Sequence, residues 1–195
     1  MPLLDVNRSV LVVIDLQGSL VHLMHRSARV QAAAQRLLGM ASLFRVPVIL
    51  TEQYPKGLGP TAPEIRAAFD SLEVPRALVE KTSFGCTGEP SFLQALARLS
   101  GGLQASDRQI VVAGIEAHVC VLQTVLELKR SDHDVHVVWE AVSSRSDEAR
   151  GHALERMQQA GAVLTSHESV GFEWARDKQH PSFKAMSALI REPLS

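Results

Sequence analysis

The sequence predicts an α/β fold in which helices cover both faces of a mostly parallel sheet. Short runs rich in β-branched residues alternate with longer stretches whose apolar residues recur every three or four positions. The short runs are apolar at nearly every position, as expected for strands buried on both faces. The 195 residues, 46% of them hydrophobic, are enough for one core, so we expect a single domain over 1–195. The predicted architecture is a three-layer α/β/α sandwich.

Six short runs are the predicted strands. Each is rich in valine, isoleucine or leucine, and segments of different character separate it from the next run. In chain order they are 9–15, 46–52, 76–81, 109–115, 134–141 and 162–166.

Four longer segments carry leucine and alanine at helical spacing, and right-handed crossovers through such helices leave the strands parallel. These segments are 26–45, 89–100, 118–131 and 147–160. One stretch, EQYPKGLGPTAP (52–63), breaks the rhythm with prolines and glycines. Because it follows a strand, we expect a loop at the carboxyl edge of the sheet, where open parallel sheets bind ligands.

Charge and motif content exclude several classes of function. The net charge is −1 with both signs interleaved, which gives no surface for nucleic acid or an anionic membrane and favours small-molecule or protein partners. The chain lacks a signal-peptide pattern and a bilayer-spanning apolar run, so a cytoplasmic location is expected. The two cysteines form neither a disulfide framework nor a zinc pattern.

No cofactor or metal site is expected from the sequence. The eight histidines include neither His-Glu-x-x-His nor an Asp-x-His pair after the second strand. His118 is open to a role as ligand or base, although capping or a surface role is favoured. Gly57 and Gly59 lack the rest of a P-loop or dinucleotide motif.

Three polar residues lie at the ends of predicted strands. Asp15 ends SVLVVID, Lys81 ends RALVEK, and Cys120 follows QIVVAGI by one short turn. Parallel strands place these ends on one edge, so the three side chains are expected to converge. A cysteine in the first turn of a helix is also near N–H groups that favour a thiolate.

The trio matches the needs of nucleophilic catalysis. Cys120 would attack, Asp15 would accept and return its proton, and Lys81 would hold the carboxylate and favour anionic states. Each residue also has a purely structural interpretation: Cys120 as a buried apolar residue, Asp15 as a helix cap, and Lys81 as a lysine whose ammonium reaches solvent. Cys86, in a glycine-containing loop, is expected to serve packing or to line the pocket.

The motifs VLVVIDLQ (10–17), LVEKTSFGC (78–86) and VVAGIEAHVCVLQT (111–124) resemble the signature regions of the isochorismatase-like cysteine hydrolases. The likeness continues through 140–170, and the tail 180–192 resembles that of the isochorismatase domain-containing proteins. The resemblance implies a Rossmann-like sheet of strand order 3-2-1-4-5-6.

The resemblance also assigns roles to individual residues. It implies Asp15, Lys81 and Cys120 as the catalytic triad, an oxyanion hole from the backbone amides of Glu116 and Cys120, and a cis peptide at Ile115–Glu116. Gly114 would give that turn room. Five further residues, at strand ends or in covering loops, are expected to contact the substrate. They are Gln17, Leu20, Gln53, Tyr54 and Phe84.

The expected reaction is hydrolysis of a small amide-type substrate through a thioester on Cys120. Two branches of the family fit less well. Nicotinamidase-type members carry an Asp-x-His metal site where this chain has TEQYPKG, and isochorismatases proper cleave a vinyl ether without a cysteine nucleophile.

Other functions remain open at this point. One is a non-catalytic interaction protein on the same scaffold, and another is a thiol redox or peroxide-responsive protein in which Cys86 resolves oxidised Cys120. A phospho-acceptor role for Asp15 lacks the acidic metal ligands it needs. A homo-oligomer, dimer or larger, is expected, with the apolar positions of 118–131 or 182–190 either at an interface or packed on the sheet.

Overall fold

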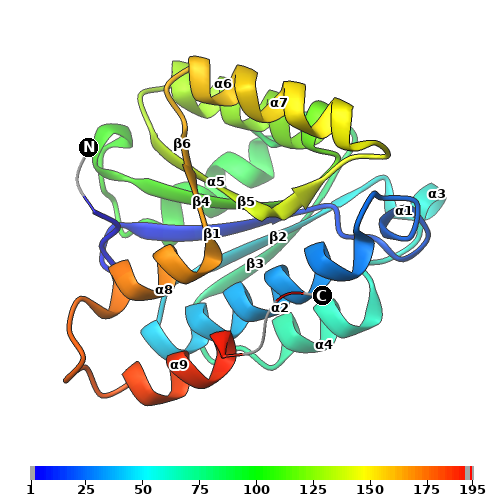
Figure 1. The fold of residues 1–195 in the computed structure, drawn as a ribbon. Helices are drawn as coiled ribbons and strands as arrows, with labels where there is room; N and C mark the ends of the chain where they lie inside the picture. Colours follow the sequence, from blue (N-terminus) through cyan, green and yellow to red (C-terminus); the bar gives the residue numbers. More distant parts are fainter. Residues whose placement is uncertain (1–2, 192–193, 195) are drawn as a thin grey trace.

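One six-stranded sheet lies between two layers of helices (Figure 1) in the computed structural model, which describes residues 3–191 and 194. The predicted domain (1–195) and tail (180–192) therefore include residues outside the described ones. The strands are β1 (Ser9–Ile14), β2 (Val48–Gln53), β3 (Arg76–Lys81), β4 (Gln109–Ile115), β5 (Asp134–Ser143) and β6 (Val163–Thr165). Their order is β3-β2-β1-β4-β5-β6 and every pairing is parallel, which confirms the predicted class and strand order.

Helices cover the two faces of the sheet in separate groups (Figure 1). One face is covered by α5 (Pro90–Leu99), α6 (Leu122–Arg130) and α7 (Asp147–Gln159). The other is covered by α2 (Ser27–Phe44), α4 (Pro63–Asp70), α8 (His167–Ala175) and α9 (Phe183–Ile190). Two short helices, α1 (Gly18–Val21) and α3 (Pro55–Leu58), complete the set.

The central strand β1 shows how the two cores arise from one sequence pattern. Val10, Val12 and Ile14 face the α5–α7 layer, and Leu11 and Val13 face the α2 layer. All five are buried, so each layer gains apolar contact at about 25 cal/mol per Å² removed from water. A strand with this burial on both faces fixes Asp15 directly beyond its end.

The structure corrects three details of the predicted elements. The segment 52–63 is not one loop, because β2 continues to Gln53 and α3 forms a helical turn that starts at Pro55. The segment 118–131 begins as a π-helical turn over Ala117–Val121 before α6. Helices α1, α4, α8 and α9 were not among the predicted ones, since the apolar spacing in those stretches is short.

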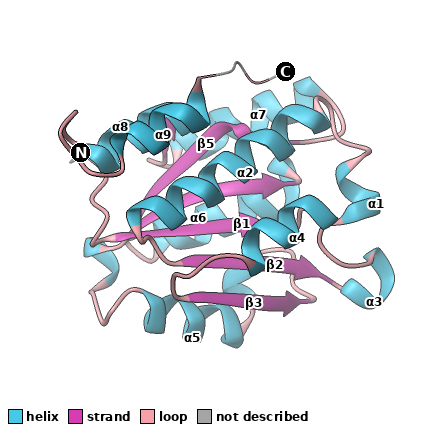
Figure 2. Ribbon diagram, turned by 90° about the horizontal axis from the view of Figure 1, so that it is seen from below, coloured by secondary structure: helices cyan, strands magenta, loops and turns pink. Residues whose placement is uncertain are grey.

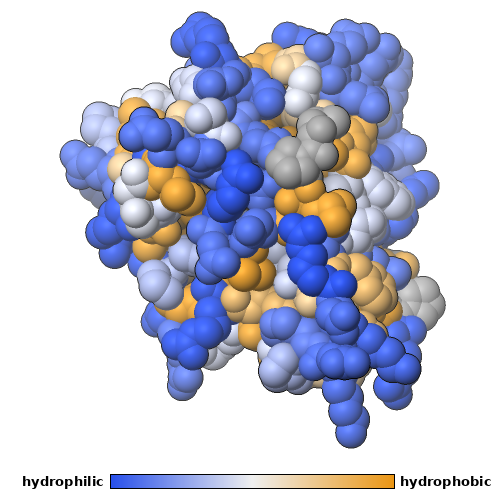
Figure 3. Space-filling model, turned by 90° about the vertical axis from the view of Figure 1, so that its left-hand side faces the viewer, coloured by the Kyte–Doolittle hydropathy of each residue, from blue (hydrophilic) through white to orange (hydrophobic). Residues whose placement is uncertain are grey.

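Two short helices, α1 and α3, lie at the carboxyl edge of the sheet. In Figure 2 the arrowheads of β1, β2 and β3 point to the end where α1 and α3 lie. The opposite face of the molecule is largely hydrophilic, with apolar side chains in smaller groups (Figure 3). In the described part of the chain, no helix is both long and apolar enough to cross a bilayer.

Candidate active site

Asp15 sits immediately after β1 with its backbone in the left-handed region, at a φ of 52°. That conformation is unfavourable for a residue with a Cβ and is tolerated where the surroundings fix it. The side chain is fully buried, and the hydroxyl of Thr51 donates to Oδ1 at 2.6 Å. Thr51 pairs in register with Ile14, so β2 delivers this hydroxyl to the carboxylate.

Gly114 explains how β1 and β4 meet beside Asp15. Its φ is 129°, and a Cβ built there would lie 2.1 Å from the carbonyl oxygen of Ile14. Only glycine permits this close approach of the two backbones. The room that glycine provides here serves the β1–β4 contact beneath the site.

Lys81 ends β3 and reaches across β2 to Asp15. Its Nζ lies 2.7 Å from Oδ2 of Asp15, and both side chains are buried. The ammonium also donates to Oε1 of Gln53 at 2.6 Å and to the carbonyls of Ser83 and Phe84 at 3.2 and 3.0 Å. Burial is the largest single influence and lowers the pKa of Lys81, but the negative charges of Asp15 and of the two cysteine thiolates, with the hydrogen bond to Asp15, together outweigh it, so the net shift is upward.

Every N–H of the Lys81 ammonium therefore has an acceptor. Removing either partner would strand a buried charge, at a cost of about 3–5 kcal/mol. Among the described groups, Oδ2 of Asp15 has no hydrogen-bond partner besides its ion pair with Lys81. One carboxylate oxygen thus remains available to a proton.

Cys120 lies in the π-helical turn and is 7% exposed. Burial raises the pKa of its thiol to about 12, and the negative charge of Asp15 adds to the shift. Lys81 acts in the opposite direction. The expectation of a thiolate stabilised by the helix N-terminus was wrong, because desolvation and a neighbouring anion outweigh the partial charge of one turn.

The turn around Cys120 has an unusual hydrogen-bond pattern. The carbonyl of Glu116 accepts from the N–H groups of Val119 and Val121, at 3.0 and 3.2 Å, and in the described chain not from that of Cys120. The Ile115–Glu116 peptide is cis. The hydroxyl of Ser144 lies 2.9 Å from Nδ1 of His118 and so ties this turn to the end of β5. This contact engages Nδ1 of His118.

Cys86 lies under the site and is fully buried. Its N–H donates to Thr124 Oγ1 at 2.9 Å, and that hydroxyl donates to the carbonyl of Cys120 at 2.7 Å. Burial, with the charge of Asp15, raises the pKa of the Cys86 thiol to about 12. Its place matches the expected packing role.

The residues expected to contact substrate divide into two groups. Gln17 is fully buried, and its amide bonds the backbone of Gln53 and the carbonyl of Gly59. Gln53 is occupied by Lys81 and by the carbonyl of Thr82. Both amides anchor the edge of the site in this structure, and a substrate contact from either stays a prediction.

The remaining three lie where a substrate contact is still possible. Leu20 is half-buried against the α2 layer. Tyr54 and Phe84 are 54% and 56% exposed, and Tyr54 lines a surface hollow with Lys81, Thr82 and Glu89. Sequence reasoning missed Thr51, Thr124 and Ser144, since a hydroxyl inside an apolar run gives no signal until the strand register is known.

A metal site does not emerge from the described residues, 3–191 and 194. They contain no cluster of three or more histidine, cysteine, aspartate or glutamate side chains placed to hold a metal ion.

Comparison with known proteins gives consistent matches over most of the chain. The isochorismatase domain matches residues 9–169. The human protein "Isochorismatase domain-containing protein 2" is 40% identical over 185 residues, which make up 95% of this chain and 84% of that protein. The MAR1 ribonuclease from Caenorhabditis elegans has a TM-score of 0.88 and 34% identity, covering 100% of this chain and 95% of that one. The YcaC gene product from Escherichia coli, described as an octameric hydrolase of unknown specificity, has a TM-score of 0.85 and 26% identity over 97% and 89%.

Proposed function

The chain belongs to the isochorismatase domain family, whose members are generally hydrolases, and from that premise we propose that it hydrolyses a small carboxamide through a thioester on Cys120. The observation that carries the proposal is the buried Asp15–Lys81 ion pair beside the Cys120 thiol. Oδ2 of Asp15 has no partner in the described chain besides its ion pair with Lys81, and it would accept the thiol proton. These groups match a nucleophile, a proton acceptor and a charge partner.

The raised pKa of Cys120 shapes the first step. The thiol keeps its proton at rest, so proton transfer to Asp15 accompanies attack of sulfur on the carbonyl carbon. The S–C bond forms while the carbonyl electron pair moves to oxygen. The N–H groups of Glu116 and Cys120 would bind this oxyanion, and the Cys120 amide is not engaged by the Glu116 carbonyl.

The tetrahedral intermediate then collapses. The C–N bond breaks, Asp15 gives its proton to the leaving ammonia or amine, and a thioester remains on Cys120. A water molecule attacks the thioester while its proton passes to Asp15. The C–S bond breaks, the acid leaves, and Asp15 returns the proton to sulfur. Lys81 balances the negative charge of Asp15 whenever that carboxylate is ionised.

Two alternatives receive less support from the site. Redox-sensing cysteines have low pKa values and are solvent-accessible, whereas both cysteines here are buried and have raised pKa values. A purely structural role leaves unexplained why Lys81 and Asp15 form a buried ion pair next to a thiol. The name of the MAR1 ribonuclease raises RNA as a possible substrate class, so a short RNA is included in the assay.

We also propose that the protein forms a homo-oligomer, as the octameric YcaC protein does.

The test is ammonia release from a panel of small aliphatic and aromatic carboxamides, together with a short RNA. Wild type, Cys120→Ser, Asp15→Asn and the control Cys86→Ser are compared. We expect turnover of at least one amide by wild type and Cys86→Ser, loss in the other two variants, and an acyl adduct on the Cys120 peptide by mass spectrometry. Undiminished turnover by Cys120→Ser, or cleavage of RNA alone, would overturn the proposal.

A further inference from the structure

The outermost strand β3 has an open edge. It ends the strand order, and Figure 2 shows it as the last strand on its side of the sheet. The carbonyls of Pro75 and Lys81, at its two ends, both accept hydrogen bonds from β2. Because backbone groups alternate in direction along a strand, the odd-numbered residues face β2 and the even-numbered ones face away. The N–H and C=O groups of Arg76, Leu78 and Glu80 therefore have no strand beside them in the described chain.

The side chains of these three residues are accessible as well. Leu78 is 38% exposed, and Arg76 and Glu80 are exposed on either side of it. Val79, between them, is buried in the core of the α5–α7 layer, as the alternation of a strand requires. A row of free backbone groups beside an exposed leucine is a surface on which another strand can pair.

The sequence of β3 is complementary to itself in one antiparallel register. If a second copy places its Leu78 opposite Leu78, then Arg76 lies opposite Glu80 of the second copy, and Glu80 lies opposite its Arg76. All three outward-facing residues then form pairs that exchange both N–H···O bonds. Opposite charges directly across a strand pair are favourable. In the next register in either direction, Leu78 meets a charged residue instead.

Both charges are placed to take part in such pairs. Within the described chain, Glu80 forms no ion pair. Arg76 donates from Nη2 to the carbonyl of Asp70 at 3.0 Å and from Nη1 to that of Leu72. These bonds hold the guanidinium at the end of α4 and use two of its five N–H donors. Its other donors remain for a carboxylate.

We propose that β3 is an interface between two copies of this chain, which pair antiparallel about Leu78 and join their sheets into one. The two-fold axis of such a pair is perpendicular to the sheet, so the two copies of α5 lie on the same side of the joined sheet. Helix α5 packs on β3, and its Leu93 is 47% exposed, which adds apolar surface beside the strands. The interface specifies one contact of the homo-oligomer proposed above and does not depend on the amidase activity.

Sedimentation velocity of the full chain over a range of concentrations tests the proposal. Arg76→Glu and Glu80→Arg each place like charges opposite one another at two points of the interface. Each single variant should therefore raise the Kd of assembly about tenfold or more. The double variant exchanges the two charges and restores the opposite pairs, so its Kd should return to within about threefold of wild type.

Two further variants separate the interface from folding and from net charge. Arg76→Glu loses its contacts with the end of α4, but the double variant loses them too, so recovery of assembly cannot come from folding. Leu78→Lys leaves those contacts intact and sets two cations side by side at the axis, so it should also dissociate the copies. The matched control is Glu155→Arg at an exposed position of α7, which should assemble as wild type does.

Hydrogen exchange locates the contact. The amides of residues 76, 78 and 80 should exchange more slowly in the assembled protein than after dilution. A wild type that stays monomeric would overturn both this interface and the proposed oligomer. If the protein assembles but Glu80→Arg and Leu78→Lys leave the Kd unchanged, or if the folded double variant is no better than the single ones, the oligomer stands and the β3 interface is wrong.

Discussion

Replacing Asp15 with asparagine separates the reactivity of the thiol from the catalysis that uses it. The change keeps the size of the side chain and removes the anion that, after burial, is the main cause of the raised pKa of Cys120. We therefore expect the pKa of Cys120 to fall and alkylation of its sulfur to become faster. Hydrolysis should stop, because the proton acceptor is gone. The two readouts move in opposite directions.

The size of the effect follows from the pKa. At pH 8 a thiol of pKa about 12 is ionised in roughly 1 of 10⁴ molecules, against roughly 1 in 4 for an ordinary cysteine of pKa about 8.5. A thiolate of higher pKa is also more nucleophilic. With a Brønsted slope of about 0.4–0.5, the rate constant of the Cys120 thiolate is roughly 40-fold higher, which offsets part of the lower ionisation. Resting Cys120 should thus label roughly 60-fold more slowly than an equally accessible ordinary thiol. Each pKa unit removed by Asp15→Asn should speed labelling roughly 3–4-fold.

The assay is iodoacetamide labelling followed by mass spectrometry of the two cysteine peptides. Cys86 is fully buried, so its protection reports that the variant is folded. Asp107→Asn, at an exposed position remote from the site, is the matched control. The reasoning is refuted if Asp15→Asn leaves Cys120 labelling unchanged or slows it while Cys86 stays protected.

Three more predictions concern stability, measured by urea unfolding. Gly114→Ala should cost about 3 kcal/mol or more, since its Cβ would overlap the Ile14 carbonyl, whereas Gly151→Ala, in open space on α7, should stabilise by up to about 1 kcal/mol; equal effects would contradict the close approach. Gln17→Leu should cost about 1–3 kcal/mol by leaving the buried backbone of Gln53 unpaired, and a neutral result would remove its anchoring role. The buried thiol of Cys86 has a pKa raised to about 12 from 9.0, so its contribution is complete below pH 9 and declines as the pH rises toward 12, by about 1.4 kcal/mol at pH 10. Cys86→Ala should lose less stability over that range than wild type, and an unchanged slope would count against the assignment.

The sequence was most informative where the determinant is local or periodic. Apolar runs predict all six strands, and the parallel class alone predicts that Asp15, Lys81 and Cys120 lie at one edge of the sheet. The pKa of the Cys120 thiol could not be predicted in this way. Its environment depends on Asp15, more than a hundred residues away, and on burial that no local pattern reveals. A prediction from the helix N-terminus alone therefore gave the wrong direction for the pKa shift of Cys120.

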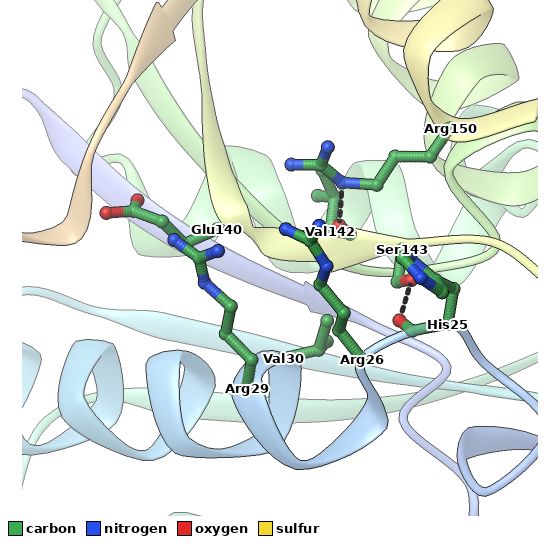
Figure 4. A pocket seen from close by; sticks show the side chains of 8 residues that line it. All are labelled: His25, Arg26, Arg29, Val30, Glu140, Val142, Ser143 and Arg150. Carbon is green, nitrogen blue, oxygen red and sulfur yellow. Dashed lines mark hydrogen bonds between the residues drawn. The ribbon is translucent and has the colours of Figure 1, made fainter. Parts of the chain in front are cut away.

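Side-chain pairings across strands were equally out of reach. Gln17 and Gln53 had the right position for substrate contacts, but their amides are consumed by the backbone and by Lys81. Arg26 and Arg29, at the start of α2, line one hollow with Arg150 of α7, and only the packing of α2 near β5 brings them together (Figure 4). Such convergence depends on tertiary structure.

The unequal lengths of β5 and β6 have a further consequence for the colloidal behaviour of the protein. β6 pairs only with residues 136–138, and β5 bulges after Val137 before it rejoins β4 at Val142. The outer side of the last part of β5 would otherwise offer free carbonyls to a strand from another molecule. Arg150 occupies the carbonyls of Trp139 and Val142, so a charged side chain covers the margin of the sheet. This single cation thereby disfavours edge-to-edge aggregation of the fold.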